Sequence, residues 1–72
     1  MNKEDLELDI SNALDKWDEH SMFTIAGVKD LSRSDIDTLS VCCDYYDQHG
    51  SLKGLGYFPI GVRIVLTRYG ML

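Results

Sequence analysis

Cysteine and histidine are the residue types in this chain best suited to catalysis or metal binding, and their spacing supports neither. His20 and His49 lie far apart, and neither has a second ligand-type side chain at a metal-binding spacing. Cys42 and Cys43 precede His49 by seven and six residues. On one helix this spacing is roughly two turns, or ~10 Å, which is too far for a nucleophile–base hydrogen bond. We therefore expect no metal site, no cofactor and no catalytic residue.

The other reactive patterns favour a binding protein over an enzyme. Adjacent side chains on a helix point about 100° apart, so Cys42 and Cys43 are expected to stay reduced and to pack as small apolar groups. No predicted helix follows Gly54 and Gly56, so these glycines do not match a phosphate-binding loop. The aspartates are expected to be solvated rather than to form an acid–base couple. We expect a non-enzymatic protein without a small-molecule substrate.

A helix over residues 34–49 is the strongest structural prediction. Ser32 and Ser34 are alternative caps for its start, because each has an aspartate three residues later. Gly50 can adopt a positive φ and predicts its end. The apolar residues that recur at three- and four-residue intervals, and so share one helical face, are Ile36, Leu39, Cys43 and Tyr46.

The segment before this helix is predicted to cover it. Asn2 is expected to cap a first helix that ends near Glu19 or His20. Residues 22–25 read as a short extended piece, and residues 26–31 read as a short, weak helix, because the glycine within them costs ~1 kcal/mol. The apolar stripe of the first helix comprises Leu6, Ile10, Ala13, Leu14 and Trp17.

After Gly50 the period of the apolar residues changes, which predicts a β-hairpin. Val62, Ile64 and Leu66 alternate with their neighbours in a segment dominated by β-branched residues. Residues 52–57 supply a weaker partner strand across a turn at residues 59–61. The predicted fold is therefore an α+β, mainly helical domain over residues 1–72, with about three helices followed by a two-stranded antiparallel hairpin.

Composition and charge restrict the setting in which such a domain works. The chain of 72 residues is 44% hydrophobic and 26% charged, as in ordinary globular proteins. It has no apolar run of the ~20 residues that span a bilayer and no signal peptide, so a cytoplasmic protein with no membrane partner is expected. The first 47 residues carry a formal charge of −8 (four bases against 12 acids), whereas the remainder carries +3 and no acid.

The order of the predicted elements resembles the winged helix-turn-helix family. The likeness is best from Asp44 to Gly54, where a helix exit precedes a first wing strand, and from Ile64 to Gly70, which is similar to the Leu-Thr-x-x-Gly that often closes the wing. It implies that residues 34–49 occupy the place of the recognition helix and that the hairpin is the wing. It departs from the family in two aspartates near the start of that helix and in an apolar wing tip.

Two functions follow as expectations. The first, ranked slightly ahead, is a small DNA-associated regulator, with possible homodimer formation. Its candidate nucleic-acid contacts are Arg33, Ser34, Thr38, Lys53, Arg63 and Arg68.

The second is an acidic protein–protein interaction module, such as an adaptor or a phage- or plasmid-type inhibitor that mimics nucleic acid and binds a basic protein. Its candidate contacts are Asp35, Asp37, Asp44, Tyr45 and Phe58. The family likeness and both expected roles depend on a hairpin after Gly50.

Overall fold

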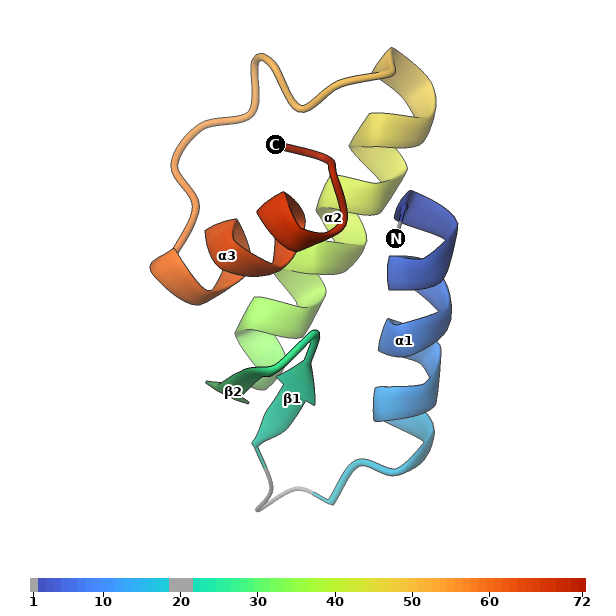
Figure 1. Ribbon diagram of the computed structural model, residues 1–72, viewed down its shortest axis with the longest axis vertical. Helices are drawn as coiled ribbons and strands as arrows, with labels where there is room; N and C mark the ends of the chain where they lie inside the picture. Colours follow the sequence, from blue (N-terminus) through green and yellow to red (C-terminus); the bar gives the residue numbers. More distant parts are fainter. Residues whose placement is uncertain (1, 19–21) are drawn as a thin grey trace.

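The computed structural model describes residues 2–18 and 22–72, which form three helices and one two-stranded antiparallel sheet (Figure 1). The elements in chain order are α1 (Lys3–Asp15), β1 (Phe23–Ile25), β2 (Val28–Leu31), α2 (Arg33–His49) and α3 (Ile60–Arg68). The hairpin therefore lies between the first two helices, and the prediction of helices followed by a hairpin wing is wrong.

Both long helices begin at the capping boxes that their sequences encode. In α1 the Asn2 side chain accepts a hydrogen bond from the backbone N–H of Asp5, whose carboxylate accepts one in return. In α2 Ser32 and Asp35 make the same exchange at 3.1 and 3.0 Å, so Ser32 is the cap and Ser34 lies inside the helix. Helix α1 ends at Asp15, before the predicted end at residues 19–20, which lies outside the described residues.

Helices α1 and α2 lie side by side and antiparallel (Figure 1). At one end Lys3 Nζ lies 2.6 Å from Asp47 Oδ1. At the other end the Arg33 guanidinium lies 5.4 Å from the centre of the Trp17 ring. This pairing places the polar sides of the two helices next to each other along their length.

The short hairpin replaces the weak helix predicted over residues 26–31. Ala26 and Gly27 both have positive φ values, 52° and 80°, which suit a two-residue hairpin turn. Asp30 (φ 62°) is an extra residue in β2, because Phe23 pairs with Leu31 but Ile25 pairs with Val28. This bulge lets Leu31 reach the core, although it lies three residues after Val28.

Residues 52–57 and 62–67 do not pair as strands; the first segment is a loop and the second lies within α3. An almost continuous apolar run fits either period, and the side chains buried in the structure recur at helical spacing. They are Val62, Val65, Leu66 and Tyr69. Burial of this helical face in the core accounts for a helix in spite of the β-branched residues. The sequence alone did not reveal this face, because residues 62, 64 and 66 also alternate as in a strand.

The motif that resembled the close of a wing is a helix C-terminus. Gly70 has a φ of 75°, and the N–H of Met71 donates to the carbonyl of Leu66 at 3.0 Å. Together with a buried Met71 side chain, this is a Schellman motif. This part of the family likeness thus belongs to a helix end rather than to a strand.

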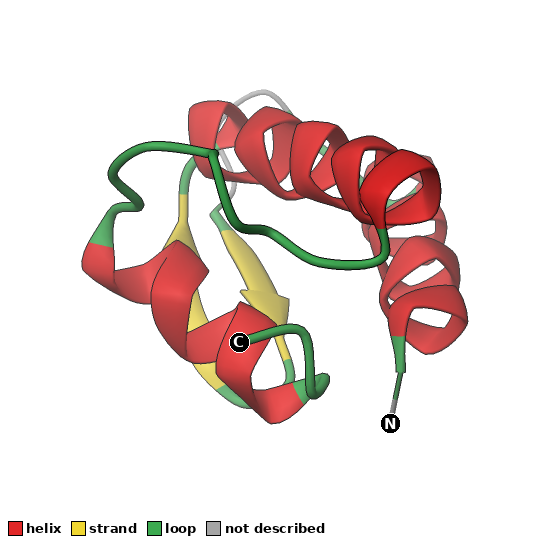
Figure 2. Cartoon of the chain, turned by 90° about the horizontal axis from the view of Figure 1, so that it is seen from above, coloured by secondary structure: helices red, strands yellow, loops and turns green. Residues whose placement is uncertain are grey.

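Strand β1 packs against α1 and strand β2 against α3, and α3 also contacts α2 directly; Figure 2 shows these elements from above. One apolar core joins all five elements, and the loop from residue 50 to 59 is held to it by Leu52 and Phe58. Phe58, one of the predicted protein contacts, is only 7% exposed and is therefore not available on the surface, whereas its neighbour Tyr57 is 88% exposed. Within the described residues, no helix is long and apolar enough to cross a membrane.

Candidate protein-binding surface

The residues predicted to contact nucleic acid do not form one surface. Arg33 begins α2, whereas Lys53 lies in the loop beyond its other end, and 17 helical residues span about 25 Å. Arg63 and Arg68 lie on α3, which packs against β2 and α2. A single duplex groove would therefore not meet this set together.

Several of those side chains are already engaged within the fold. The Arg33 Nε donates to Asp37 at 3.1 Å, and its guanidinium also lies over the Trp17 ring. Arg68 donates to the carbonyl of Ala26 and so ties α3 to the hairpin turn. The Thr38 hydroxyl donates to the carbonyl of Ser34 at 3.0 Å. These three side chains therefore stabilise the fold through contacts within the chain.

The candidates for a protein contact separate into structural and exposed groups. Asp35 is half-buried and caps α2, and the half-buried Tyr45 donates its hydroxyl to the carbonyl of Lys53 at 2.6 Å. Asp37 and Asp44 are exposed on α2. Asp37 pairs with Arg33 at 3.1 Å, and Asp44 lines a groove next to α1.

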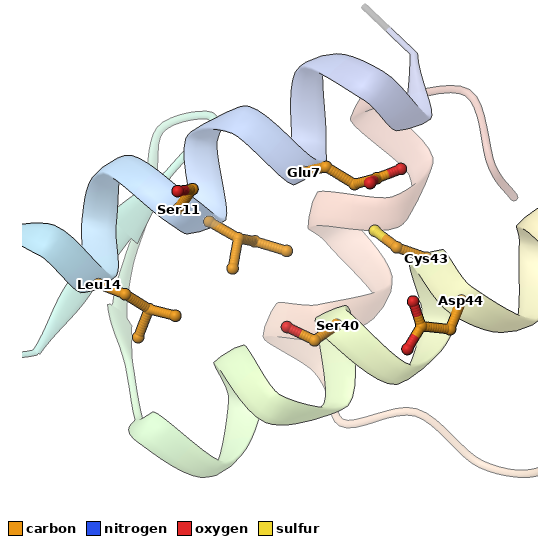
Figure 3. Close-up of a pocket in the computed structure, with 7 residues that line it drawn as sticks. Glu7, Ser11, Leu14, Ser40, Cys43 and Asp44 are labelled. Carbon is orange, nitrogen blue, oxygen red and sulfur yellow. The ribbon is translucent and has the colours of Figure 1, made fainter.

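A groove of about 270 Å³ runs between α1 and α2 (Figure 3). Its buried side is apolar, and carboxylates and hydroxyls from both helices stand beside it. The lining residues are Glu7, Ile10, Ser11 and Leu14 from α1, with Ser40, Cys43 and Asp44 from α2.

The groove residue Glu7 already contacts a cation of the chain that is not itself part of the groove lining. The Lys3 ammonium contacts both Glu7 and Asp47, and its side chain is 11% exposed. The hydrogen bond to Asp47 and then that to Glu7 raise the pKa of Lys3 above its ordinary value of 10.5. The pair of carboxylates formed by Glu7 and Asp47 thus favours the charged form of the Lys3 ammonium.

The thiol in the groove is unsuited to nucleophilic chemistry. Cys43 is 3% exposed, and burial, followed by the negative charge of Glu7, raises its pKa to about 12. The thiol is therefore protonated near neutral pH. In the described part of the chain, no three His, Cys, Asp or Glu side chains gather as a group that could hold a metal ion.

Sequence reasoning missed Glu7, Asp47, Ser11 and Ser40 as members of a shared surface. Their positions on the polar sides of two predicted helices were readable from the apolar stripes. Which sides of the helices meet is a tertiary property, so no sequence signal identified the groove.

A second surface, on α3, differs in chemistry from the groove. Ile60 is 77% exposed, and Ile64 lies one turn later on the same side of the helix, with Arg63 beside them. Tyr57 precedes them in the loop. This face is apolar and basic, whereas the α1–α2 face is acidic.

Comparison with known proteins gives no relative for this chain: no family model, no curated protein and no solved structure matches it.

Proposed function

We propose that this protein is a non-enzymatic protein-binding module whose acidic face, formed by the outer sides of α1 and α2, docks on a basic surface of another protein. Residues 50–72 form a loop and α3 instead of the hairpin on which this role was expected to depend. The observation that carries the proposal is instead the convergence of carboxylates from two antiparallel helices on one groove. Glu7 comes from α1 and Asp44 from α2. Asp47 and Asp37 are exposed on α2, where they pair with Lys3 and Arg33.

The arrangement of charge favours a protein partner over nucleic acid. Phosphate groups would be repelled by the acidic face at long range. The bases that could attract them are scattered, and Arg33 and Arg68 already make contacts within the fold. A DNA-binding protein presents a basic surface of the kind that the acidic face would fit, so an inhibitor that competes with nucleic acid is one form of this proposal.

Several charges must act together for such a face to bind. An exposed ion pair contributes only about 0.2–1 kcal/mol, so no single carboxylate supplies the affinity. Charges on a common face add their fields, and they also speed the encounter with a partner of opposite charge. Binding should therefore weaken as salt rises, because the screening length at physiological ionic strength is about 8 Å.

The test is a pull-down with the immobilised chain from an extract of its own organism, with bound proteins eluted by a salt gradient. Asp44→Asn should lower the retention of basic proteins at least threefold, and Glu7→Gln together with Asp44→Asn should lower it further. Asp30→Asn is the matched control, since it removes the same charge from an exposed position in β2 and asparagine tolerates its positive φ.

Two results would overturn the proposal. One is equal loss of retention in Asp44→Asn and Asp30→Asn, which would indicate a response to net charge alone. The other is a gel shift of duplex DNA by the unaltered protein at low salt that is lost in Arg63→Ala. That result would indicate that the partner is nucleic acid.

A further inference from the structure

We infer that the groove between α1 and α2 receives one lysine or arginine side chain from the partner, and that Lys3 competes with that side chain for the carboxylates. This inference rests on the proposed function and names the chemistry of its central contact. It assigns separate roles to the apolar bottom of the groove, to its polar rim and to Lys3 beside that rim.

The bottom of the groove suits the aliphatic part of a basic side chain. Ile10 and Cys43 are buried there, and the half-buried Leu14 closes one end. Lysine and arginine carry three or four methylene groups, which can lie along an apolar surface while the charged head stays near polar groups. The apolar strip therefore favours a basic side chain over a small cation, which carboxylates alone would attract equally well.

The rim supplies partners for the charged head. Glu7 on α1 and Asp44 on α2 provide carboxylates, and Ser11 and Ser40 provide hydroxyl oxygens that can accept hydrogen bonds (Figure 3). An ammonium has three donors and a guanidinium has five, so either head can engage oxygens from both helices. The binding contact would thereby bridge α1 and α2.

Lys3 does not line the groove, but it contacts one of the rim carboxylates. Its ammonium lies between Glu7 and Asp47, so one rim carboxylate already binds a lysine head. An incoming cation must share Glu7 with Lys3 or displace Lys3 towards Asp47. Removing the Lys3 charge should therefore make more of the rim available.

The volume of the groove restricts its occupant. About 270 Å³ lies below the range of about 300–1,000 Å³ that is usual for pockets that enclose a small-molecule ligand. A groove of this size and open shape can hold a single side chain presented by a larger surface. It thus suits an anchor residue at the centre of a protein interface.

The test is a titration of the ¹⁵N-labelled full chain, followed by amide chemical shifts, with lysine and arginine blocked at both ends as acetyl and methylamide derivatives. Blocked norleucine reports the apolar stem without the charge, and methylguanidinium reports the charge without the stem. Both basic amino acids should shift the amides of Ser11, Ser40, Cys43 and Asp44, and each partial probe should bind at least threefold more weakly.

Three variants separate the groove from general acidity. Lys3→Met keeps an unbranched stem but removes the charge, and should tighten binding of the blocked basic amino acids at least threefold. Ser40→Leu fills the groove without changing any charge, and should abolish the localised shifts. Asp30→Asn should leave them unchanged.

Shifts spread over all exposed carboxylates, or equal binding by the unaltered chain and Ser40→Leu, would overturn the inference. If retention of basic proteins persists and depends on Asp44 while Ser40→Leu retains them fully, the acidic face binds without an anchor side chain. In that case the inference fails and the proposed function stands. If the blocked amino acids bind in the groove but no protein is retained, the proposed function fails instead.

Discussion

At the scale of single residues, burial changes the chemistry of side chains that look reactive in the sequence. Cys43 lies beside a groove but is almost fully buried, and its thiol is protonated at neutral pH. Phe58 and Tyr57 are neighbours in the chain, yet the first is in the core and the second is in solvent. The identity of a residue therefore limits its chemistry, and its surroundings decide which part of that chemistry is available.

The first prediction is a loss of stability at alkaline pH that depends on Cys43. Its pKa is about 12 in the folded protein, against 9.0 for an ordinary thiol, so the unfolded chain loses this proton first. The contribution to stability is complete below pH 9 and declines as pH rises from 9 towards 12. Urea unfolding should show a loss of roughly 3 kcal/mol by about pH 11, from about 1.4 kcal/mol for each of the two pH units above 9.

Cys43→Ala is the control for this prediction. The variant should be less stable at neutral pH, because it leaves a cavity, but its stability should fall less steeply above pH 9. Tyr69 and Cys42, whose pKa values burial also raises, should account for the remaining slope. An unchanged slope in Cys43→Ala would assign the alkaline loss to other groups.

At the scale of elements, the capping residues of the two long helices were easier to predict than whether a short segment forms a helix or a strand. The capping boxes at Asn2 and Ser32 and the glycine after His49 each depend on a few neighbouring residues, and the structure contains all three. The hairpin turn at Ala26–Gly27 lacks the asparagine or aspartate that usually signals it, so its sequence predicts a weak helix instead. The segment from residue 60 to 68 satisfies two periods at once, and local reasoning favours the wrong one.

The second prediction tests the end of α2. Gly50 has a φ of 74°, and no atom lies within 4 Å of the position where a Cβ would stand. Gly50→Ala should therefore destabilise the protein by about 1 kcal/mol through backbone strain alone. Thermal or urea unfolding of both proteins measures this difference.

Gly56→Ala is the matched control, because that position is equally open and does not require a positive φ. This variant should leave stability unchanged or raise it by up to about 1 kcal/mol, since alanine reduces the freedom of the unfolded chain. Equal destabilisation by the two alanines would contradict the role of Gly50 as a left-handed cap.

At the scale of the whole molecule, contacts between distant segments decide which faces remain exposed. The Tyr69 hydroxyl donates to the Asp9 carboxylate, which joins the end of α3 to α1 across 60 residues of sequence. Arg68 similarly joins α3 to the hairpin turn. With α3 held in this place, the outer sides of α1 and α2 stay uncovered and form the acidic face.

The third prediction concerns this long-range contact. Tyr69→Phe removes the hydroxyl but keeps the ring, which is 2% exposed. It should lower the free energy of unfolding by about 1–2 kcal/mol, because the Asp9 carboxylate loses a donor in a half-buried position. Tyr57→Phe, at an exposed ring, should change stability by less than about 0.5 kcal/mol. Equal effects in urea unfolding would mean that the Tyr69 hydroxyl contributes nothing.

The sequence by itself determined the features that depend on near neighbours. Helices α1 and α2, their N-terminal caps, most of their buried apolar positions and the division of charge between the two parts of the chain could be read from spacing and residue type. Trp17 is the exception, because it lies beyond α1 and is 37% exposed. These properties come from hydrogen bonds and side-chain positions within a turn or two of helix, so they do not require knowledge of the fold.

Only the tertiary structure decided that the residues after Gly50 form a loop and a helix, and that Glu7 faces Asp44 across a groove. An apolar segment adopts whichever period lets its side chains fill the available core, and that core is built by the other elements. The groove likewise exists because two helices, each with an ordinary polar side, pack antiparallel. Neither outcome is encoded in any single stretch of the chain.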